Sequence, residues 1–465
     1  MVVQSKFSLT EGSIPRALLA FSLPILFGNV LQSVNGSVNA VWVGKYLGEA
    51  AFAAVGNSNV VMFLMFGVMF GFTMATTVMV AQCVGAKNVA EAKRVVGTSA
   101  VFFLGLSVSM SVLGFAVTHL LLMWLRTPPD ALPFALAYMR IIFLAYPFMG
   151  GLFFLMAVLR GAGDSRTPFM YLSLSVVLDI VLNPLLIFGW GPVPRLGVAG
   201  SATATLIAQA VSFLALVVHL YRTHHFLRIR GDELALFTVD WSLVRVLVTK
   251  GIPMGLQLFV VSSSMIALTS LVNRFGSQET AAFNAAMQLW NYVQMPAFAI
   301  AAAVSSMVAQ NVGARKWDRV GKVVATGVTF NFLMGGSLIA ILYVLNRSAL
   351  GLFLPANGAA IEIASHLNVV ILWSFALFGV SMVLFGAVRA TGAVMPPLLI
   401  LIISLWGVRV PFAYEMLSHW QAEAIWWSFP LASLTSVAMA AGYYRFGGWR
   451  NARLGIAEGA AAPTA

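Results

Sequence analysis

The peptide Val80-Ala81-Gln82-Cys83-Val84-Gly85-Ala86-Lys87 recurs as Val308-Ala309-Gln310-Asn311-Val312-Gly313-Ala314-Arg315, at an offset of 308 − 80 = 228 residues. Three other pairs of features keep an offset of 228 or 229 residues. Agreement in register at four places indicates that the chain contains two copies of one structural unit. The other pairs are Arg94-Val95-Val96 with Lys322-Val323-Val324, Arg160-x-x-Gly163 with Arg389-x-x-Gly392, and Pro24 with Pro253.

The composition around the repeat is that of a protein in lipid. Hydrophobic residues make up 60% of the 465 residues and charged residues only 9%, with a mean hydropathy of +0.90; soluble domains carry about 25% charged residues. Apolar runs long enough to cross about 30 Å of hydrocarbon as helices recur along the whole chain, whereas strands of a membrane barrel would be about 10 residues long with alternating polarity. We therefore predict an all-α integral membrane protein with spans at 17–43, 51–79, 95–120, 134–158, 168–189, 200–221, 246–272, 281–308, 323–346, 361–387, 395–415 and 422–444.

The distribution of positive charge predicts the orientation of these spans. The net charge is +12, and 20 of the 27 Lys and Arg residues fall in the two tails and the even-numbered loops. The positive-inside rule places these segments in the cytoplasm, so we expect a multi-pass protein of a bacterial inner membrane with both termini inside. Because no basic stretch interleaves aromatic residues on a soluble domain, we expect no nucleic-acid partner. The division that follows is 1–16 N-terminal segment, 17–221 first six-helix bundle, 222–245 cytoplasmic linker, 246–444 second bundle and 445–465 tail.

Two features limit the remaining chemistry. Cys83 is the single cysteine, which excludes an internal disulfide and multi-cysteine metal sites. The first apolar run is long and lacks a small-residue cleavage pattern, so we expect it to remain as a span rather than to be removed as a signal peptide. We expect no metal and no cofactor.

Because each half has an even number of spans, both halves enter the membrane from the same side. Transporters use such parallel repeats, and rocking of one bundle against the other opens a central cleft to each face in turn. The repeated Gln-x-x-Gly-Ala-basic motif is expected to end a helix at the cytoplasmic surface, with Gly85 and Gly313 as C-caps. Pro24 and Pro253, near the starts of the first and seventh spans, are expected to be conformationally important.

One acidic residue, Asp179, lies in the middle of a span. A carboxylate is costly in lipid and is a functional candidate by default, since burial favours its protonated form and hydration its charged form. Asn183 lies one turn away on the same face, and Pro184 leaves the carbonyl of Ile180 without its usual partner. This group could carry H⁺ or hold Na⁺, and the alternative is a structural aspartate bonded inside the bundle.

Two other helices carry rows of amides. Gln32, Asn35 and Asn39 lie on one face of the first span. These side chains either line a wet substrate cavity or hydrogen-bond between helices. The eighth span carries Asn284, Gln288, Asn291 and Gln294, and we assign Gln257 of the seventh span to the same cavity.

Two further groups of residues receive structural interpretations. Arg409, just before Pro411, is expected to extend to the membrane surface or to pair with Glu415. Four tryptophans are expected to anchor the chain at the membrane interface. They are Trp406, Trp420, Trp426 and Trp427.

Taken together, the motifs resemble those of the multidrug and toxic compound extrusion (MATE) transporters. The resemblance covers about residues 12 to 445 and implies a V-shaped pair of six-helix bundles that export organic, often cationic, compounds in exchange for H⁺ or Na⁺. The motifs that carry it are Leu23-Pro24, Val41-Trp42-Val43-Gly44 before Leu47-Gly48, the duplicated Val-Ala-Gln-x-Val-Gly-Ala, Arg160-Gly161-Ala162-Gly163-Asp164, Asn183-Pro184 before Phe188-Gly189, and Gly197-Val198-Ala199-Gly200.

The departures from the family pattern concern the acidic residues. The NorM-like branch has a glutamate in the seventh helix, where this chain has Ser262 to Ser264, so the chain is more similar to the DinF-like branch. That branch has an aspartate at the position of Asn39, and an Asn-x-x-x-Asp pair at the positions of Asp179 and Asn183. Here the first acid is an amide and the pair is inverted, which moves the carboxylate by about 6 Å along the helix.

The resulting prediction is a secondary active antiporter and not an enzyme. Its ion-coupling residues are Asp179, Asn183 and Asn39. Its partners are small organic, cationic or amphipathic substrates and the lipid bilayer, and we expect a monomer. Two alternatives remain: a lipid-linked precursor flippase, which would need several basic residues in its cavity, and a membrane-embedded transferase, which would need clustered His and Asp in loops.

Overall fold

The computed structural model describes residues 9–189, 194–355, 358–452 and 454. These residues form helices and their connections and contain no strand, which confirms the predicted all-α class. The expected segment 1–16 and tail 445–465 lie partly outside the described residues. The long helices of the first half are α1 Ile14–Tyr46, α2 Glu49–Gly85, α3 Val89–Trp124, α4 Leu132–Gly161, α5 Arg166–Phe188 and α6 Val198–Arg222.

The second half repeats this order with more interruptions. Its long helices are α7 Trp241–Val272, α8 Ser277–Gly313, α9 Trp317–Val344 and α16 Ala422–Phe446. Two spans are broken into pieces: α11 Ala359–Ile371 with α12 Ser374–Arg389, and α13 Met395–Leu401 with the π-helix η3 Ile402–Arg409 and α14 Val410–Glu415. The short helices are η1 Gly231–Leu236, η2 Asn273–Phe275, α10 Asn346–Leu350, α15 Leu417–Trp420 and η4 Gly448–Asn451.

The number of spans agrees with the twelve expected from the sequence. Eleven helices of the described chain are long and apolar enough to cross a membrane, and the pair α11 and α12, bent by 47°, makes a twelfth. The bend interrupts the span expected at 361–387, and α7 begins at Trp241 rather than at residue 246. Lipid cannot form hydrogen bonds with backbone N–H and C=O groups, and a helical span pairs these groups within itself.

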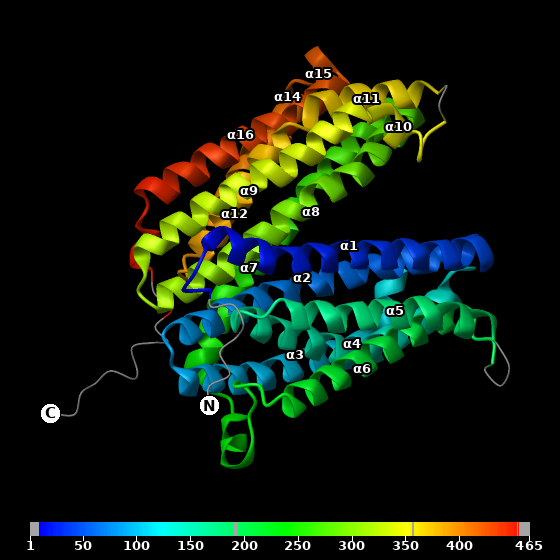
Figure 1. The fold of residues 1–465 in the computed structure, drawn as a ribbon. Helices are drawn as coiled ribbons and strands as arrows, with labels where there is room; N and C mark the ends of the chain where they lie inside the picture. Colours follow the sequence, from blue (N-terminus) through cyan, green and yellow to red (C-terminus); the bar gives the residue numbers. More distant parts are fainter. Residues whose placement is uncertain (1–8, 190–193, 356–357, 453, 455–465) are drawn as a thin grey trace. The chain divides into compact units, whose positions relative to one another are not determined.

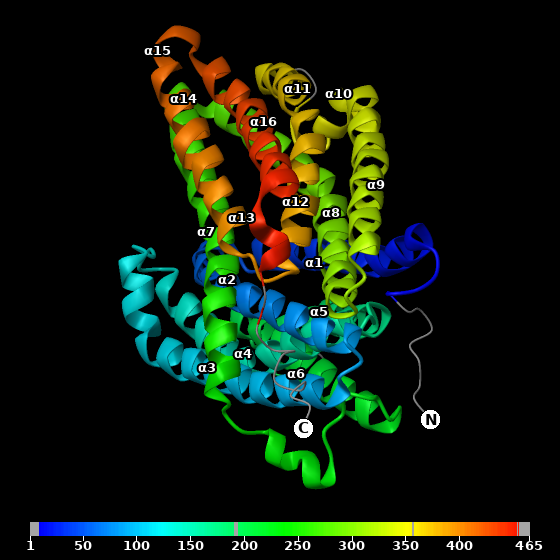
Figure 2. The same ribbon diagram turned by 90° about the vertical axis from the view of Figure 1, so that its left-hand side faces the viewer.

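The chain divides into two compact units, which we describe separately. The N-terminal unit contains Phe27–Gly251, and the described residues of 8–26 and 252–465 belong to the C-terminal unit. Within the first unit α4 packs on α2, α3 and α6, and α5 packs on α6 (Figure 1). Within the second unit α12 packs on α8, α9 and α16 (Figure 2). Two helices, α1 and α7, pass from one unit to the other, close to Pro24 and Pro253 respectively.

The repeated motifs end helices, but through different residues from those expected. Gly85 and Gly313 are the last helical residues of α2 and α8 and do not adopt the left-handed backbone conformation of a C-cap glycine. Lys87 and Arg315 take that conformation, with φ of 58° and 57°. The backbone N–H groups that follow return to the helix, from Asn88 to the Cys83 carbonyl at 3.0 Å and from Lys316 to the Asn311 carbonyl at 2.8 Å. The expected glycine C-caps are therefore wrong, because the chain turns two residues later.

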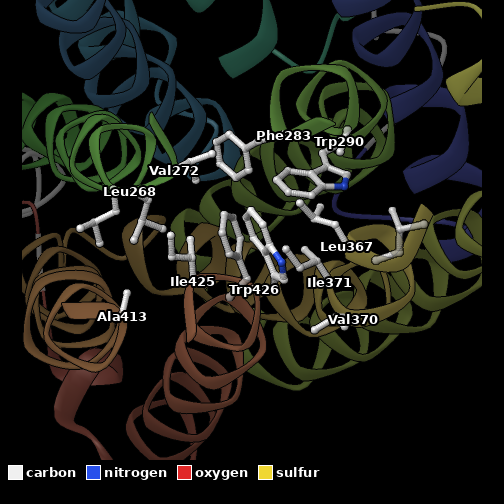
Figure 3. Close-up of a cluster of buried hydrophobic side chains, with 14 of the residues drawn as sticks. Leu268, Val272, Phe283, Trp290, Leu367, Val370, Ile371, Ala413, Ile425 and Trp426 are labelled. Atoms are coloured by element: carbon white, nitrogen blue, oxygen red, sulfur yellow. The ribbon is translucent and has the colours of Figure 1, made fainter. Parts of the chain in front are cut away.

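The C-terminal unit has an aromatic core (Figure 3). Trp290, Phe283 and Phe429 pack edge-to-face with ring centroids 5.2 to 6.3 Å apart, and Phe283 stacks on Trp426 at 5.8 Å. Trp426 is only 2% exposed, so its expected role as an interface anchor is wrong. Because lipid tails are as apolar as these side chains, close packing rather than removal from water stabilises such a core.

The segment 223–240, which connects α6 to α7, folds against α3 of the N-terminal unit. Lys93 of α3 forms an ion pair with Glu233 of η1 at 2.6 Å, and Arg94 forms another with Asp240. The hydrogen bond from Lys93 is the main cause that holds the pKa of Glu233 below its ordinary value. The pKa of Asp240 is also below its ordinary value, first because of the hydrogen bond from Ser242 and also because of the one from Arg94. The segment is therefore a docked element of the first unit.

Candidate functional site

Asp179 lies in α5 with its side chain buried, 3% exposed. Its Oδ2 atom accepts hydrogen bonds from Nδ2 of Asn35 and Nδ2 of Asn39, both at 2.9 Å, and its Oδ1 atom accepts one from the Thr205 hydroxyl at 3.0 Å. Three helices, α1, α5 and α6, thus supply one carboxylate and three donors. None of the ion pairs between described residues includes Asp179, so the hydrogen-bond donors that hold its carboxyl group are neutral.

Asn183 extends this network by one turn of α5. Its Nδ2 donates to Oδ1 of Asn39 at 2.8 Å, so Asn39 connects both polar residues of α5. The structure therefore brings together all three residues predicted for ion coupling. Two amide oxygens, Oδ1 of Asn35 and Oδ1 of Asn183, are buried without a hydrogen-bond partner. Such orphaned acceptors are expensive and mark a place where a proton carrier, a water or a cation would be stabilised.

Two residues of this site were missed from the sequence. Thr205 of α6 contacts the carboxylate, and its hydroxyl also donates to the Ser201 carbonyl at 3.3 Å. Tyr138 of α4 is close enough to Asp179 for an electrostatic interaction. A threonine in a helix usually bonds to its own helix, and nothing in the local sequence shows which threonine also reaches another helix.

An apolar cluster lies next to the polar residues along α1 and α6. Its members lie one turn beyond Asn39 on α1 and one turn before Thr205 on α6, together with residues of α2 and α4. Low polarity beside a carboxylate strengthens every hydrogen bond that it accepts and raises the energy of leaving it unpaired. The cluster consists of Val43, Ala51, Val55, Tyr138, Ile142, Val198 and Ala202.

The donors and acceptors around Asp179 suit more than one monovalent cation. The Thr205 hydroxyl can donate to an ionised carboxylate, or accept from a protonated one while it donates its own hydrogen bond to the Ser201 carbonyl. The carboxylate and the two orphaned amide oxygens are also the hard oxygen ligands that Na⁺ prefers. The residues present therefore fit either H⁺ or Na⁺.

The other predicted residues do not belong to this cluster. Gln32 is exposed and makes no hydrogen bond among the described residues. Gln257 is buried, accepts a hydrogen bond from Nη1 of Arg389 at 2.9 Å and leaves its own Nε2 without a partner. Pro184 does not break α5, which continues to Phe188.

The amides of α8 are arranged differently from those of α1. Asn284, Gln288 and Asn291 are exposed and make no hydrogen bond to another helix within the described chain. Gln294 donates to the carbonyl of Trp290 in its own helix at 3.3 Å. Interhelical bonding therefore does not account for this row, and an exposed amide stripe on a membrane helix requires water rather than lipid beside it.

A separate cavity of about 360 Å³ lies in the N-terminal unit between α3, α4, α6 and the connecting segment. Its walls are mostly apolar, with Phe103, Phe154 and Phe213 among them, and His225 and Arg228 also line it. Burial lowers the pKa of His225 below its ordinary value. None of the predicted site residues lines this cavity.

Comparison with known proteins identifies the family. The model of the family described as MatE matches twice, over residues 24–185 and 253–415, so the two matches begin 253 − 24 = 229 residues apart. The chain belongs to the MatE family. It is accordingly a membrane transporter and not an enzyme. The family model matches each of the two halves that the sequence repeat indicated.

The relatives span the whole chain. A probable multidrug resistance protein of Bacillus subtilis (strain 168), YoeA, is 37% identical over 96% of each chain, and a second from the same strain, YpnP, is 30% identical over 96% of this chain and 98% of its own. A solved structure described as the outward-facing conformation of a multidrug resistance MATE family transporter of the MOP superfamily has a TM-score of 0.86 over 94% of this chain and 96% of its own, with 20% identity. That similarity supports the fold.

Proposed function

We propose that this MATE transporter exports organic, amphipathic or cationic compounds in exchange for H⁺, with Na⁺ as the alternative coupling ion, by alternating access. The proposal places the protein in a bacterial plasma membrane, as a monomer with both termini in the cytoplasm. The names of the two Bacillus relatives, both probable multidrug resistance proteins, support drugs as the substrate class. The exposed amides of α8 support a wet, hydrogen-bonding wall for such substrates.

The observation that carries the proposal is the buried carboxyl group of Asp179, which has three neutral donors and, among the described residues, no ion pair. A structural aspartate in a membrane bundle is expected to pair with a cation or to share its charge with the backbone. Here the neighbours can accommodate both states of the carboxyl group, because Thr205 can reverse its hydrogen bond. Binding and release of a proton at this point would alter the bonds that join α1, α5 and α6.

The test is substrate efflux from proteoliposomes with a pH gradient and a Na⁺ gradient imposed separately, on the wild type and on Asp179→Asn. We expect the pH gradient to drive efflux in the wild type and not in Asp179→Asn, whose amide can form similar hydrogen bonds but cannot exchange a proton. Asp130→Asn is the matched control, because Asp130 is exposed and makes no ion pair or hydrogen bond among the described residues.

Three results would contradict parts of the proposal. Efflux by Asp179→Asn at the wild-type rate would remove Asp179 from coupling. Efflux that follows the Na⁺ gradient alone would assign the orphaned oxygens to Na⁺ and exclude H⁺. Failure of both gradients with every dye or drug tested, together with translocation of a lipid-linked precursor, would replace the antiporter with a flippase.

A further inference from the structure

Arg409 is a buried cation in the C-terminal unit, 6% exposed. It lies well inside the apolar segment Met395–Glu415, at the point where the π-helix η3 meets α14. The expected ion pair with Glu415 is absent, since none of the ion pairs between described residues includes either side chain. An unpaired charge at this depth is costly and is by default a functional candidate.

The contacts of Arg409 fix its guanidinium without supplying an oxygen acceptor. The central carbon lies 3.6 Å from the ring centroid of Phe429 on α16, a distance at which the guanidinium stacks on the ring. Nη2 lies 3.9 Å from the Met265 sulfur on α7, which is a weak acceptor, and Nε is buried without a partner. Stacking occupies the face of the guanidinium, so its N–H groups remain in an oriented fork.

Two other arginines, the buried Arg389 and the partly exposed Arg160, have different surroundings. Arg389 donates to Gln257 and, like Arg160, ends its helix in a repeated Arg-x-x-Gly motif. A cation at that place is stabilised by the negative end of the helix dipole. Arg409 has no oxygen partner among the described residues, and although η3 ends at Arg409 the chain continues directly into α14.

The helix beside Arg409 also has the form of a site. A π-helix is rare and occurs frequently at functional sites, and here it covers the eight residues Ile402–Arg409. On the same segment the indole of Trp406 is partly exposed and donates to the Ser263 hydroxyl of α7 at 3.2 Å. Because Trp406 and Arg409 both contact α7, an aromatic surface and an oriented cation face the same helix.

We propose that Arg409 binds the carboxylate or phosphate of an aromatic, amphipathic substrate. The fork of N–H groups matches two oxygens of such an oxyanion, and the rings of Phe429 and Trp406 match its apolar part. The inference rests on the proposed export function and narrows its substrate class: the exported compounds include acids and zwitterions.

The test is binding of 2-naphthoate and of its neutral analogue 2-naphthamide to the purified full-length protein in detergent without added phospholipid. We expect the wild type to bind the acid at least about 10-fold more tightly than the amide, as for the gain of a charge-assisted hydrogen bond. Arg409→Met should lose this preference, and Arg409→Lys should keep part of it. Arg274→Met, at an exposed arginine of the same unit, should behave as the wild type.

Thermal unfolding without ligand separates a binding role from a structural one. Replacing an unpaired buried charge by an apolar side chain is often neutral or stabilising, so Arg409→Met should melt at or above the wild-type temperature. In the wild type 2-naphthoate should raise the melting temperature, and in Arg409→Met it should not. Lower stability of Arg409→Met with an unchanged preference for the acid would assign Arg409 to structure and overturn the proposal.

Two further outcomes also overturn it. If the wild type does not distinguish acid from amide, no anion site exists. If only phosphatidylglycerol stabilises the wild type and not Arg409→Met, the oxyanion belongs to a lipid and not to a substrate. Efflux of a dye without an acidic group, measured on the same variants, tests the export function separately. If the wild type does not export any such dye, the proposed export function is contradicted and the anion site is not.

Discussion

Thr205 is the residue whose replacement tests the proposed proton exchange most directly. Its hydroxyl donates to Oδ1 of Asp179 at 3.0 Å and has a second acceptor, the Ser201 carbonyl, at 3.3 Å. We therefore compare Thr205→Val, which keeps the shape and removes the hydroxyl, with Thr205→Ser, which keeps the hydroxyl. Both changes leave the carboxylate and its two amide donors in place.

The expected size of the effect follows from the two states of the carboxyl group. In the ionised state Thr205→Val loses a hydrogen bond to a charge, worth about 1.5 to 3 kcal/mol, and in the protonated state it loses a neutral one, worth about 1 kcal/mol. The difference of about 1 kcal/mol favours the protonated state by about fivefold. Proton release should become the slow step, so efflux driven by a pH gradient should fall several-fold.

The assay is initial efflux from proteoliposomes over a series of internal and external pH values, with a melting temperature for each variant. Thr205→Ser should stay within about twofold of the wild type, since its hydroxyl can make both bonds. A uniform loss of rate at every pH in Thr205→Val would indicate a packing defect. Wild-type efflux in Thr205→Val at all pH values would refute the reasoning, because the carboxylate would then need no reversible partner.

Two predictions concern other parts of the fold. Gly163 and Gly392 have φ of 91° and 96°, and an alanine at either place is strained by about 1 to 2 kcal/mol. Gly163→Ala and Gly392→Ala should therefore each lower the melting temperature. The control Gly336→Ala should not, because Gly336 lies in helix α9 with open space around it. The lowered pKa of His225, caused first by burial, means that its stabilising effect is complete above about pH 6.5 and is lost as the pH falls through the lower folded-state value. Limited proteolysis of the segment 223–240 should therefore become faster as the pH is lowered from 7.5 to 5. The increase should be smaller in His225→Gln.

The span pattern was predictable because lipid imposes it. Each predicted span corresponds to one helix or to a helix broken into two or three pieces, and the ends of the spans differ from those predicted. The bend between α11 and α12 was not predictable, since both pieces are equally apolar and no proline marks the break. The left-handed residues Lys87 and Arg315 were missed for a related reason: glycine is the usual left-handed residue at a helix end, and here the basic residue two positions after the glycine takes that conformation.

The polar cluster was predictable in part. The spacing of Asp179 and Asn183 on one helix, and of Asn35 and Asn39 on another, gave four of its members, because residues one turn apart share a face. Thr205 depends on the rotation of α6 against α5, which side-chain packing determines and local sequence does not. Gln257 illustrates the opposite case, where a buried arginine uses an amide that the sequence assigned to the cavity.

The two halves share a frame and differ in the charge that each one buries. Helix ends occur in matching pairs, yet the position that matches Asp179 is Val408, and the cation follows at the next residue, Arg409. Among the described residues, the fifth span of each half therefore buries one ionisable side chain that forms no ion pair, the acid Asp179 in α5 and the base Arg409 in the segment Met395–Glu415. A duplicated scaffold does not require either charge, since the partner half folds without it. Because an unpaired charge in the membrane lowers stability, retention of two with opposite sign is most simply explained by two separate ligands, a cation at Asp179 and an oxyanion at Arg409.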